Sequence, residues 1–383
     1  MRYLDVFEEV VVIARVADVP YAQREWNRAD GSGVSFFRIP YYVGAAAYLK
    51  NYLPVRAAIR DLTRNMDALV MRGVSVVNRS LLSSLMKGRP FGVEVIGDPH
   101  DVFAPGSVQH PLRPFLRWWL ARTLKEQCKT ACALAYVTSS TLQKRYPSDH
   151  DAFVTSYSSI ELPDLALVKH VRQFGPIHSL KIVTVGSLEQ MYKGIDVLID
   201  AIAICRSWGK SVELAIVGEG RYQDQLKDQV NQRQLSHVVN FMGQLHTKAD
   251  MWELFDNAHL FVLPSKAEGL PRAMIEAMAR ALPCIGTDVG GIPELLSAED
   301  LVPRGDAVAL AHKIVEVASG PGRLHKMAEH HLRIAHQYAD AVLAPRRRKF
   351  LTHLREVTQD WKHSLRISRS ELRHEETSLE SVL

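Results

Sequence analysis

The feature that most constrains this chain is a strand–loop–helix pattern between Ala258 and Glu276. Four consecutive apolar residues, Leu260 to Leu263, have the length and composition of a strand that is buried on both faces of a parallel sheet. The strand pattern stops at Pro264, and Pro271 then suits the first position of a helix. Apolar residues recur after it at helical spacing, at Met274, Ala277, Met278 and Ala281. The sequence therefore predicts a βα unit of an α/β protein.

Two carboxylates mark this unit, Glu268 in the loop and Glu276 in the helix. In an open parallel sheet, the loops at the carboxyl ends of the strands line the ligand crevice, and free N–H groups at a helix start favour an anion. A phosphorylated ligand is therefore expected. The alternative is that Glu276 pairs with Arg272, four residues before it, on the protein surface.

The segment from Glu268 to Glu276 resembles the Glu-x7-Glu signature of the retaining glycosyltransferases of family 4. Three other segments agree with that family in the same order. They resemble its phosphate-binding loop (Val185 to Gly194), its next strand and turn (Ile216 to Gly220) and its later Gly-rich turn (Thr287 to Glu294). The resemblance implies the α/β fold called GT-B, in which two Rossmann-like doubly wound domains face each other across a cleft.

The same resemblance implies a role for each carboxylate. Glu276 would accept hydrogen bonds from the ribose hydroxyls of a nucleotide, and Glu268 would contact the donor sugar near the reacting carbon. Lys193 would place a positive charge on the donor diphosphate. A lysine at a helix start is disfavoured by the helix dipole, which also favours a functional role for Lys193.

Backbone groups would share the diphosphate with Lys193. We expect the amides of Gly269 and Leu270 to contribute, and the resemblance implies that Gly186 and Gly218 lie beside the donor. Ser187 stands where the family usually has an arginine, and it can still donate a hydrogen bond.

In the amino-terminal half, the strand-like segment Gly92 to Ile96 leads to Asp98 and His100, a position where crevice residues are expected. In the family a histidine near this point often faces the donor sugar, and either His100 or Asp98 would fill that role. The alternative is a turn in which Asp98 and Asp101 cap the next element.

Basic and aromatic residues are interleaved between His110 and Lys125. The basic residues are Arg113, Arg117, Arg122 and Lys125, and the aromatic ones are Phe115, Trp118 and Trp119. Such a segment either lies on an anionic membrane surface or forms a helix whose tryptophans pack inward while its arginines are solvated.

Composition is that of a globular protein of two domains, with 383 residues, 47% apolar and 23% charged. The net charge of +5 gives no case for nucleic acid as a partner. The four cysteines are scattered, which suits free thiols in a reducing cytoplasm. No run of 18 apolar residues and no leader pattern occurs. We therefore expect a cytoplasmic protein, with peripheral contact at the inner face of the cytoplasmic membrane as an option.

The order of strand-like and helical segments predicts the domain organisation. Residues 1–165 would form an acceptor-binding Rossmann-like domain, 166–179 a linker, 180–345 the nucleotide-sugar-binding domain, and 346–383 a helix that crosses back, with a peripheral or disordered tail from Lys362. Val74 to Val77 is expected as part of a strand, and Ala133 to Val137 as the last strand of the first domain. The family's usual first strand and Gly-rich loop have no counterpart in the pattern, so either the true start lies upstream or this domain closes differently.

Taken together, the resemblance implies a retaining, metal-independent glycosyltransferase without a cofactor. It would move a hexose from a UDP- or GDP-sugar to a polysaccharide or lipid-linked acceptor of the cell envelope. Two alternatives share the fold. One is a sugar-nucleotide epimerase, and the other is a non-catalytic sugar-nucleotide-binding protein, which the missing first unit and Ser187 favour.

Overall fold

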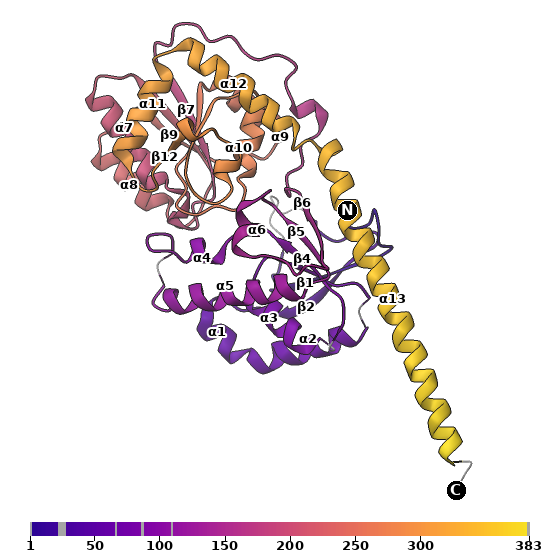
Figure 1. Cartoon of the computed structure of the whole chain (residues 1–383). Coiled ribbons are helices and arrows are strands. Elements are labelled where there is room, and N and C mark those ends of the chain that lie inside the picture. Colours follow the sequence, from indigo (N-terminus) through magenta and orange to yellow (C-terminus); the bar gives the residue numbers. More distant parts are fainter. Residues whose placement is uncertain (1, 22–27, 66, 86–87, 109, 381–383) are drawn as a thin grey trace.

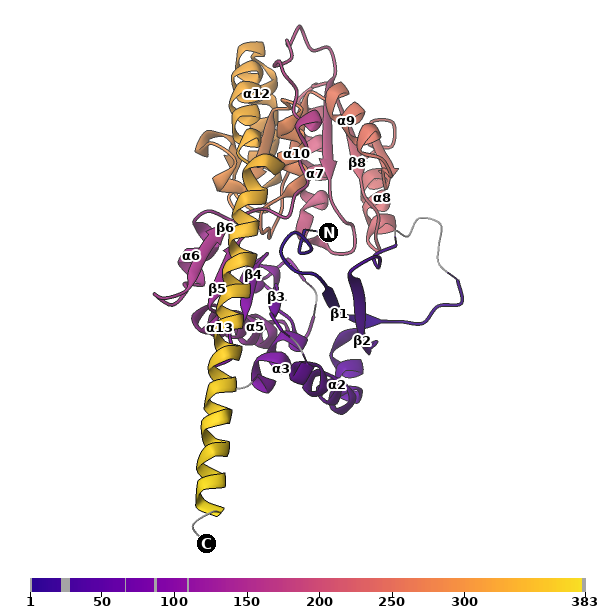
Figure 2. The same cartoon turned by 90° about the vertical axis from the view of Figure 1, so that its right-hand side faces the viewer.

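The computed structural model describes residues 2–21, 28–65, 67–85, 88–108 and 110–380 (Figure 1). The chain forms an amino-terminal and a carboxy-terminal α/β domain, and a long helix at its end runs from the second domain along the first and beyond it (Figures 1 and 2). One cluster of buried apolar side chains contains residues from both domains and from this helix. The two domains are therefore packed as one body around shared apolar contacts.

The carboxy-terminal domain holds a six-stranded parallel sheet in the order β12-β11-β10-β7-β8-β9, so the predicted doubly wound parallel sheet is confirmed. Its strands are β7 (Leu180–Val185), β8 (Val212–Val217), β9 (Val239–Gly243), β10 (Leu260–Leu263), β11 (Cys284–Thr287) and β12 (Leu301–Val302). The helices are α7 (Ile195–Ser207), α8 (Gln223–Gln232), α9 (Lys248–Asn257), α10 (Arg272–Ala279), α11 (Ala307–Ala318) and α12 (Pro321–His336). Short 3₁₀ turns lie at η2 (Met191–Lys193), η3 (Ile292–Glu294) and η4 (Ala298–Asp300).

The amino-terminal domain holds a four-stranded parallel sheet in the order β3-β4-β5-β6 and a separate parallel pair, β1-β2. Its strands are β1 (Val10–Val16), β2 (Val34–Pro40), β3 (Val70–Arg72), β4 (Gly92–Val95), β5 (Ala133–Tyr136) and β6 (Phe153–Ser156). The helices are α1 (Gly44–Lys50), α2 (Tyr52–Asn65), α3 (Val76–Ser84), α4 (Pro99–Val102), α5 (Arg113–Thr130) and α6 (Thr141–Arg145). A 3₁₀ turn, η1 (Asp164–Ala166), follows the sheet.

Two expectations for this domain are wrong. The segment Val74 to Val77 is not a strand, because Ser75 caps a helix there: its side chain accepts from the Asn78 amide at 3.1 Å, and α3 begins at Val76. Strand β5 is not the last one, since β6 pairs with it in parallel over its whole length. A four-residue strand with half-buried residues gives little periodic signal in a sequence, which is why β6 was not expected.

Helix α13 (Asp340–Glu380) crosses back onto the first domain, where Phe350 and Leu354 lie against Gly92 of β4. A Cβ at Gly92 would lie 2.9 Å from the Phe350 ring, so the glycine lets the helix approach the strand. The tail from Lys362, expected to be peripheral or disordered, is helical up to Glu380 and runs out beyond the first domain, so of the two alternatives it is peripheral. The Lys362 ammonium pairs with Asp67 of the first domain, which connects the start of this tail to that domain. Among the described residues, no helix combines the length and apolar character that a bilayer crossing requires.

Candidate functional site

The strand order of the carboxy-terminal sheet places the crevice. Strands β7, β8 and β9 follow one another on one side, and the chain then returns to pair β10 with the other edge of β7. In open α/β sheets, ligands bind beyond the carboxyl ends of the strands at such a switch point. The loops that leave β7 and β10 carry Lys193 and Glu268 respectively, so both residues lie at this point.

Lys193 and Glu268 form an ion pair across the switch point. The ammonium donates to both carboxylate oxygens, at 2.8 and 3.0 Å, and the two side chains are only 16% and 10% exposed. The Ser265 hydroxyl donates to the same carboxylate at 3.0 Å, and the Thr287 hydroxyl donates to the Ser265 carbonyl at 2.6 Å. An ammonium has three N–H donors, so one remains to bind an anion while Glu268 is held in place.

Glycines let the loops around this pair approach one another backbone to backbone. Gly218 has φ +130°, and a Cβ there would lie 2.0 Å from the Gly186 carbonyl oxygen. Gly290 has φ +55°, and a Cβ there would lie 1.9 Å from the carbonyl oxygen of Glu268. Any larger residue at these two positions collides with the neighbouring backbone. The turns after β7 and β8 are therefore in contact with each other, and so are the turns after β10 and β11 beside Glu268.

The start of α10 supplies backbone donors to the same place. Among the described residues, no acceptor binds the amides of Gly269 and Leu270, and Pro271 caps the helix without a side-chain hydrogen bond. The Gly269 carbonyl accepts from the Gly291 amide at 2.7 Å, which fixes the loop. Free N–H groups at a helix start bind anions, so this loop suits a phosphate group. Ser187 is exposed, and its hydroxyl oxygen accepts from the Glu189 amide at 3.3 Å.

Glu276 lies on α10 as a half-buried carboxylate. Burial raises its pKa, and the positive charges of Arg272 and Lys248 oppose that effect. In the described part of the chain, neither cation lies within ion-pair distance of the Glu276 carboxylate. The alternative of a surface ion pair between Glu276 and Arg272 is therefore wrong. A half-buried carboxylate without an ionic partner is suited to accept hydrogen bonds from ligand hydroxyls.

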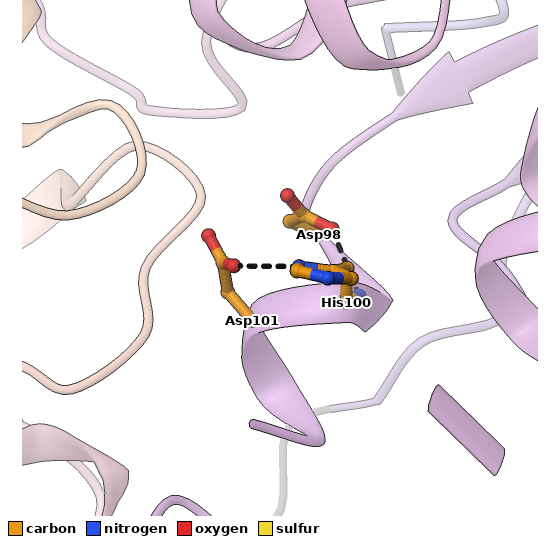
Figure 3. A group of neighbouring side chains, drawn as sticks. All are labelled: Asp98, His100 and Asp101. Atoms are coloured by element: carbon orange, nitrogen blue, oxygen red, sulfur yellow. Dashed lines mark hydrogen bonds and ion pairs between the residues drawn. The ribbon is translucent and has the colours of Figure 1, made fainter. Parts of the chain in front are cut away.

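The structure separates Asp98 from His100 on the opposite side of the cleft. Asp98 is 4% exposed and caps α4: it accepts from the His100 amide at 2.8 Å and the Tyr146 hydroxyl at 2.5 Å, and it pairs with Arg145. Its carboxylate is thus occupied by three donors. The capping alternative is confirmed for Asp98 but is wrong for Asp101, which lies within α4 and pairs with Arg145. The His100 side chain is 42% exposed, and its Nδ1 lies 3.1 Å from Asp101, as Figure 3 shows. His100 is therefore the residue of the two that can face a ligand.

The carboxylates of Asp98 and Asp101 and the His100 ring lie within 4.8 Å of one another, which is close enough to hold a metal ion (Figure 3). The Arg145 guanidinium binds both carboxylates, at 2.9 Å in the case of Asp101. A guanidinium therefore already supplies the positive charge that these carboxylates need.

Three contacts between the domains bring the two sides of the cleft together. Gly269 lies against the Ile96 carbonyl oxygen, just past β4, so closely that a Cβ on Gly269 would be 2.4 Å from that oxygen. Arg304 donates to the Lys266 carbonyl at 2.9 Å and to the Pro105 carbonyl at 2.8 Å, so it joins the loop of Glu268 to the loop after α4. The third contact is made by Glu294.

Glu294 anchors the Gly-rich turn of the second domain to the start of α6 in the first. Its two oxygens accept six hydrogen bonds, 2.5 to 3.1 Å long, from the amides and hydroxyls of Ser139, Ser140 and Thr141. Burial alone would raise the pKa of Glu294, but these donors outweigh it and lower the pKa to about 2. The sequence reasoning missed this contact. The available signal was a run of four hydroxyl residues, Thr138 to Thr141, at a helix start, which is a cluster of hydrogen-bond donors.

Comparison with known proteins finds relatives for the carboxy-terminal domain and for most of the chain. Residues 173–332, which contain Lys193, Glu268 and Glu276, match the family described as glycosyl transferases group 1. CapJ of Staphylococcus aureus is 26% identical over 82% of this chain and 78% of its own length. The amylovoran biosynthesis glycosyltransferase AmsK of Erwinia amylovora is 34% identical, over 37% of this chain and only 36% of AmsK.

Among solved structures, HepE of Anabaena in complex with UDP and glucose superposes with a TM-score of 0.57 at 19% sequence identity. The match covers 87% of this chain and 85% of HepE. At this identity the likeness concerns the fold alone. The predicted fold class is confirmed: the chain has the GT-B architecture, with two Rossmann-like domains that face each other.

Proposed function

We propose that this chain, whose residues 173–332 form a group 1 glycosyl transferase domain, is a retaining hexosyltransferase of the family 4 type. Its donor is a UDP- or GDP-sugar, and its acceptor is a growing polysaccharide or a lipid-linked glycan of the cell envelope. The observation that carries the proposal is the Lys193–Glu268 pair at the switch point, beside the unbound amides of Gly269 and Leu270. AmsK is a glycosyltransferase of amylovoran biosynthesis, and HepE forms a complex with UDP and glucose; both support the same reaction class.

The donor diphosphate binds between a cation and a helix start. The remaining N–H of Lys193 and the amides of Gly269 and Leu270 bind its oxygens, and Glu276 accepts from the ribose hydroxyls. When the glycosidic bond breaks, negative charge develops on the leaving phosphate oxygen, and fixed donors stabilise that charge without reorganising. No step of this scheme needs a metal or a cofactor, because Lys193 and the amides take up the charge.

The sugar lies between Glu268 on one side of the cleft and His100 on the other. Glu268 stabilises the positive charge that an oxocarbenium-like transition state places on the reacting carbon. The acceptor hydroxyl attacks from the face that the phosphate leaves, and the departing phosphate takes its proton, so the anomeric configuration is retained. Because Lys193 and Ser265 already hold the Glu268 carboxylate, its orientation is fixed before the donor binds.

Nucleotide release from a panel of sugar nucleotides, with and without a lipid-linked acceptor, tests the proposal. Release that requires the acceptor, with retained configuration in the product, supports the transferase. Release without an acceptor indicates an epimerase, and a donor that is bound but left intact indicates a binding protein; either result refutes the proposal. Lys193→Met is the diagnostic variant, and Lys210→Met, at an exposed turn after α7, is its control with the same loss of charge.

We also propose that the protein works in the cytoplasm, because its four free thiols suit a reducing compartment. A peripheral position at the inner face of the cytoplasmic membrane would bring it to a lipid-linked acceptor. The aromatic side chains of Phe115 and Trp118 on α5, which are 53% and 59% exposed, support such a contact. The expectation that both tryptophans of this helix pack inward is wrong for Trp118.

A further inference from the structure

A groove with a volume of about 540 Å³ lies beside α4 and α5 of the amino-terminal domain. Figure 1 shows α4 between α5 and the carboxy-terminal domain. Four cations line the groove, namely Arg113, Arg117, Arg122 and Lys125. Its lining, within the described ranges, includes no acidic residue. The groove is therefore a concave surface with a strongly positive field.

This charge arrangement is unfavourable for α5 itself. Arg113 and Arg117 are four residues apart on the first turns, and Lys125 continues the same stripe two turns later. Like charges at this spacing repel, and cations at a helix start oppose the helix dipole. The first turn carries no acidic residue to offset them. A bound anion would relieve this repulsion.

Two of the cations are held in place by neighbours, and two are not. The Arg117 Nε donates to the His100 carbonyl at 2.8 Å, which orients the guanidinium along the wall of the groove, and Arg122 pairs with Glu126 at 3.3 Å. Within the described residues, Arg113 and Lys125 form no ion pair. One fixed guanidinium and two uncompensated cations around a hollow make a site for a group with more than one negative charge.

The groove lies next to the donor site. Its lining includes His100 and Pro105, and the Pro105 carbonyl accepts from Arg304. The same guanidinium donates to the carbonyl of Lys266, two residues before Glu268. If the charged group of a ligand lies in the groove, the part of the ligand attached to that group would thus lie near Glu268 in the cleft. Trp118 is part of the lining, and its ring lies 6.2 Å from that of Phe115; both side chains are more than half exposed and form an apolar rim on α5.

We propose that this groove binds the diphosphate group of a lipid-linked acceptor, while its apolar rim contacts the lipid. The inference deepens the proposed transferase function and rests on it. It assigns the acceptor class, a glycan carried on a lipid diphosphate, and makes Arg113, Arg117 and Lys125 acceptor-binding residues. A neutral polysaccharide chain has no group that needs these charges.

The test measures binding of the full-length protein to phosphatidylcholine vesicles that contain a small fraction of polyprenyl diphosphate. Saturating UDP or GDP is present to occupy the donor site. Vesicles with phosphatidylglycerol at the same surface charge distinguish the diphosphate from any anionic lipid headgroup. The variant is Arg113→Ala with Lys125→Ala. Its control is Lys129→Ala with Lys144→Ala, which removes the same charge from exposed positions outside the groove. Circular dichroism checks that both variants are folded.

We expect the groove variant to lose at least about tenfold in affinity for the polyprenyl diphosphate vesicles, because two charge-assisted contacts are removed. The control should stay within about twofold, and soluble inorganic diphosphate should compete with the vesicles for the unmodified protein. Equal losses in both variants, or equally tight binding to phosphatidylglycerol vesicles, would overturn the proposal and make α5 a general membrane surface.

Thermal stabilisation by UDP and GDP, measured on the same samples, tests the donor site separately. If neither nucleotide stabilises the protein but the groove variant still loses vesicle binding, the groove assignment holds and the transferase assignment fails. If a nucleotide stabilises both proteins but vesicle binding is unchanged in the groove variant, only the groove assignment fails.

Discussion

Replacing Glu294 with glutamine should weaken the contact between the domains, and the effect should become smaller in acid. The carboxylate accepts six hydrogen bonds from Ser139, Ser140 and Thr141, and it is these donors that lower its pKa to about 2 against the burial that would raise it. A carboxyl group with a depressed folded-state pKa stabilises the fold above its unfolded-state pKa, and this stabilisation is lost as the pH falls toward the folded-state value.

The size of the effect follows from the shift. A fall from 4.5 to about 2 corresponds to about 3.4 kcal/mol at neutral pH. Glu294 is partly exposed, so solvent screening reduces this to about 2 kcal/mol. For a domain of this size that is a difference of roughly 4 to 8 °C in thermal midpoint at pH 7. More than half of the difference should be lost between pH 7 and pH 3, since the group is progressively protonated in the unfolded state over that range.

The assay compares the thermal midpoints of the unmodified protein, Glu294→Gln and Glu253→Gln from pH 7 to pH 3. Glu253 is an exposed carboxylate on α9 and serves as the control. Hydrogen exchange gives a local readout, because the amides of Ser139 and Thr141 donate to Glu294 and should exchange faster in Glu294→Gln. A midpoint difference that does not change with pH, or an equal loss in Glu253→Gln, would refute the reasoning.

Three further substitutions test the donor site. Lys193→Met should lower the transfer rate by about 10²- to 10³-fold, the usual effect of removing one stabilising donor from a transition state, and a rate within a few-fold of the unmodified protein would exclude the role. Glu276→Gln should weaken nucleoside diphosphate binding by about tenfold in calorimetry. Because burial raises the pKa of Glu276, the affinity of the unmodified protein should increase as the pH rises through that pKa, and the glutamine variant should lack this dependence. Gly290→Ala should lower both the thermal midpoint and the transfer rate, because its Cβ would collide with the Glu268 carbonyl. Gly305→Ala, at φ +78° with no atom within 4 Å, should retain transfer, and equal loss of transfer in both variants would argue against the collision.

The sequence predicted the local units of the second domain well. Strand β10, the loop of Glu268 and helix α10 follow from a short apolar run, a proline and helical spacing, all within about twenty residues. The glycine motifs were also visible, since a backbone that approaches another backbone tolerates no side chain. The first domain was predicted less well. Its strands β3 and β6 have only three and four residues, and a serine cap turned an expected strand into the start of α3.

The tertiary structure decided which residues distant in the sequence come into contact. Lys193 and Glu268 are 75 residues apart, and the order of the strands brings them together because β10 returns to the edge of β7. Asp98 and His100 were equivalent candidates until Arg145 and Tyr146, on a different element, were seen to bind the Asp98 carboxylate.

The sequence by itself thus determined which backbone segments form the glycine turns beside Glu268, because those depend on steric and periodic patterns within a few residues. The tertiary structure alone decided which side chains are charged partners, which are caps and which stay exposed. Glu294 and its donors are separated by 153 to 155 residues, and only the packing of two separate sheets places them within hydrogen-bond distance. The energies of such contacts depend on burial and on the position of every neighbouring charge, and neither is encoded in the local pattern.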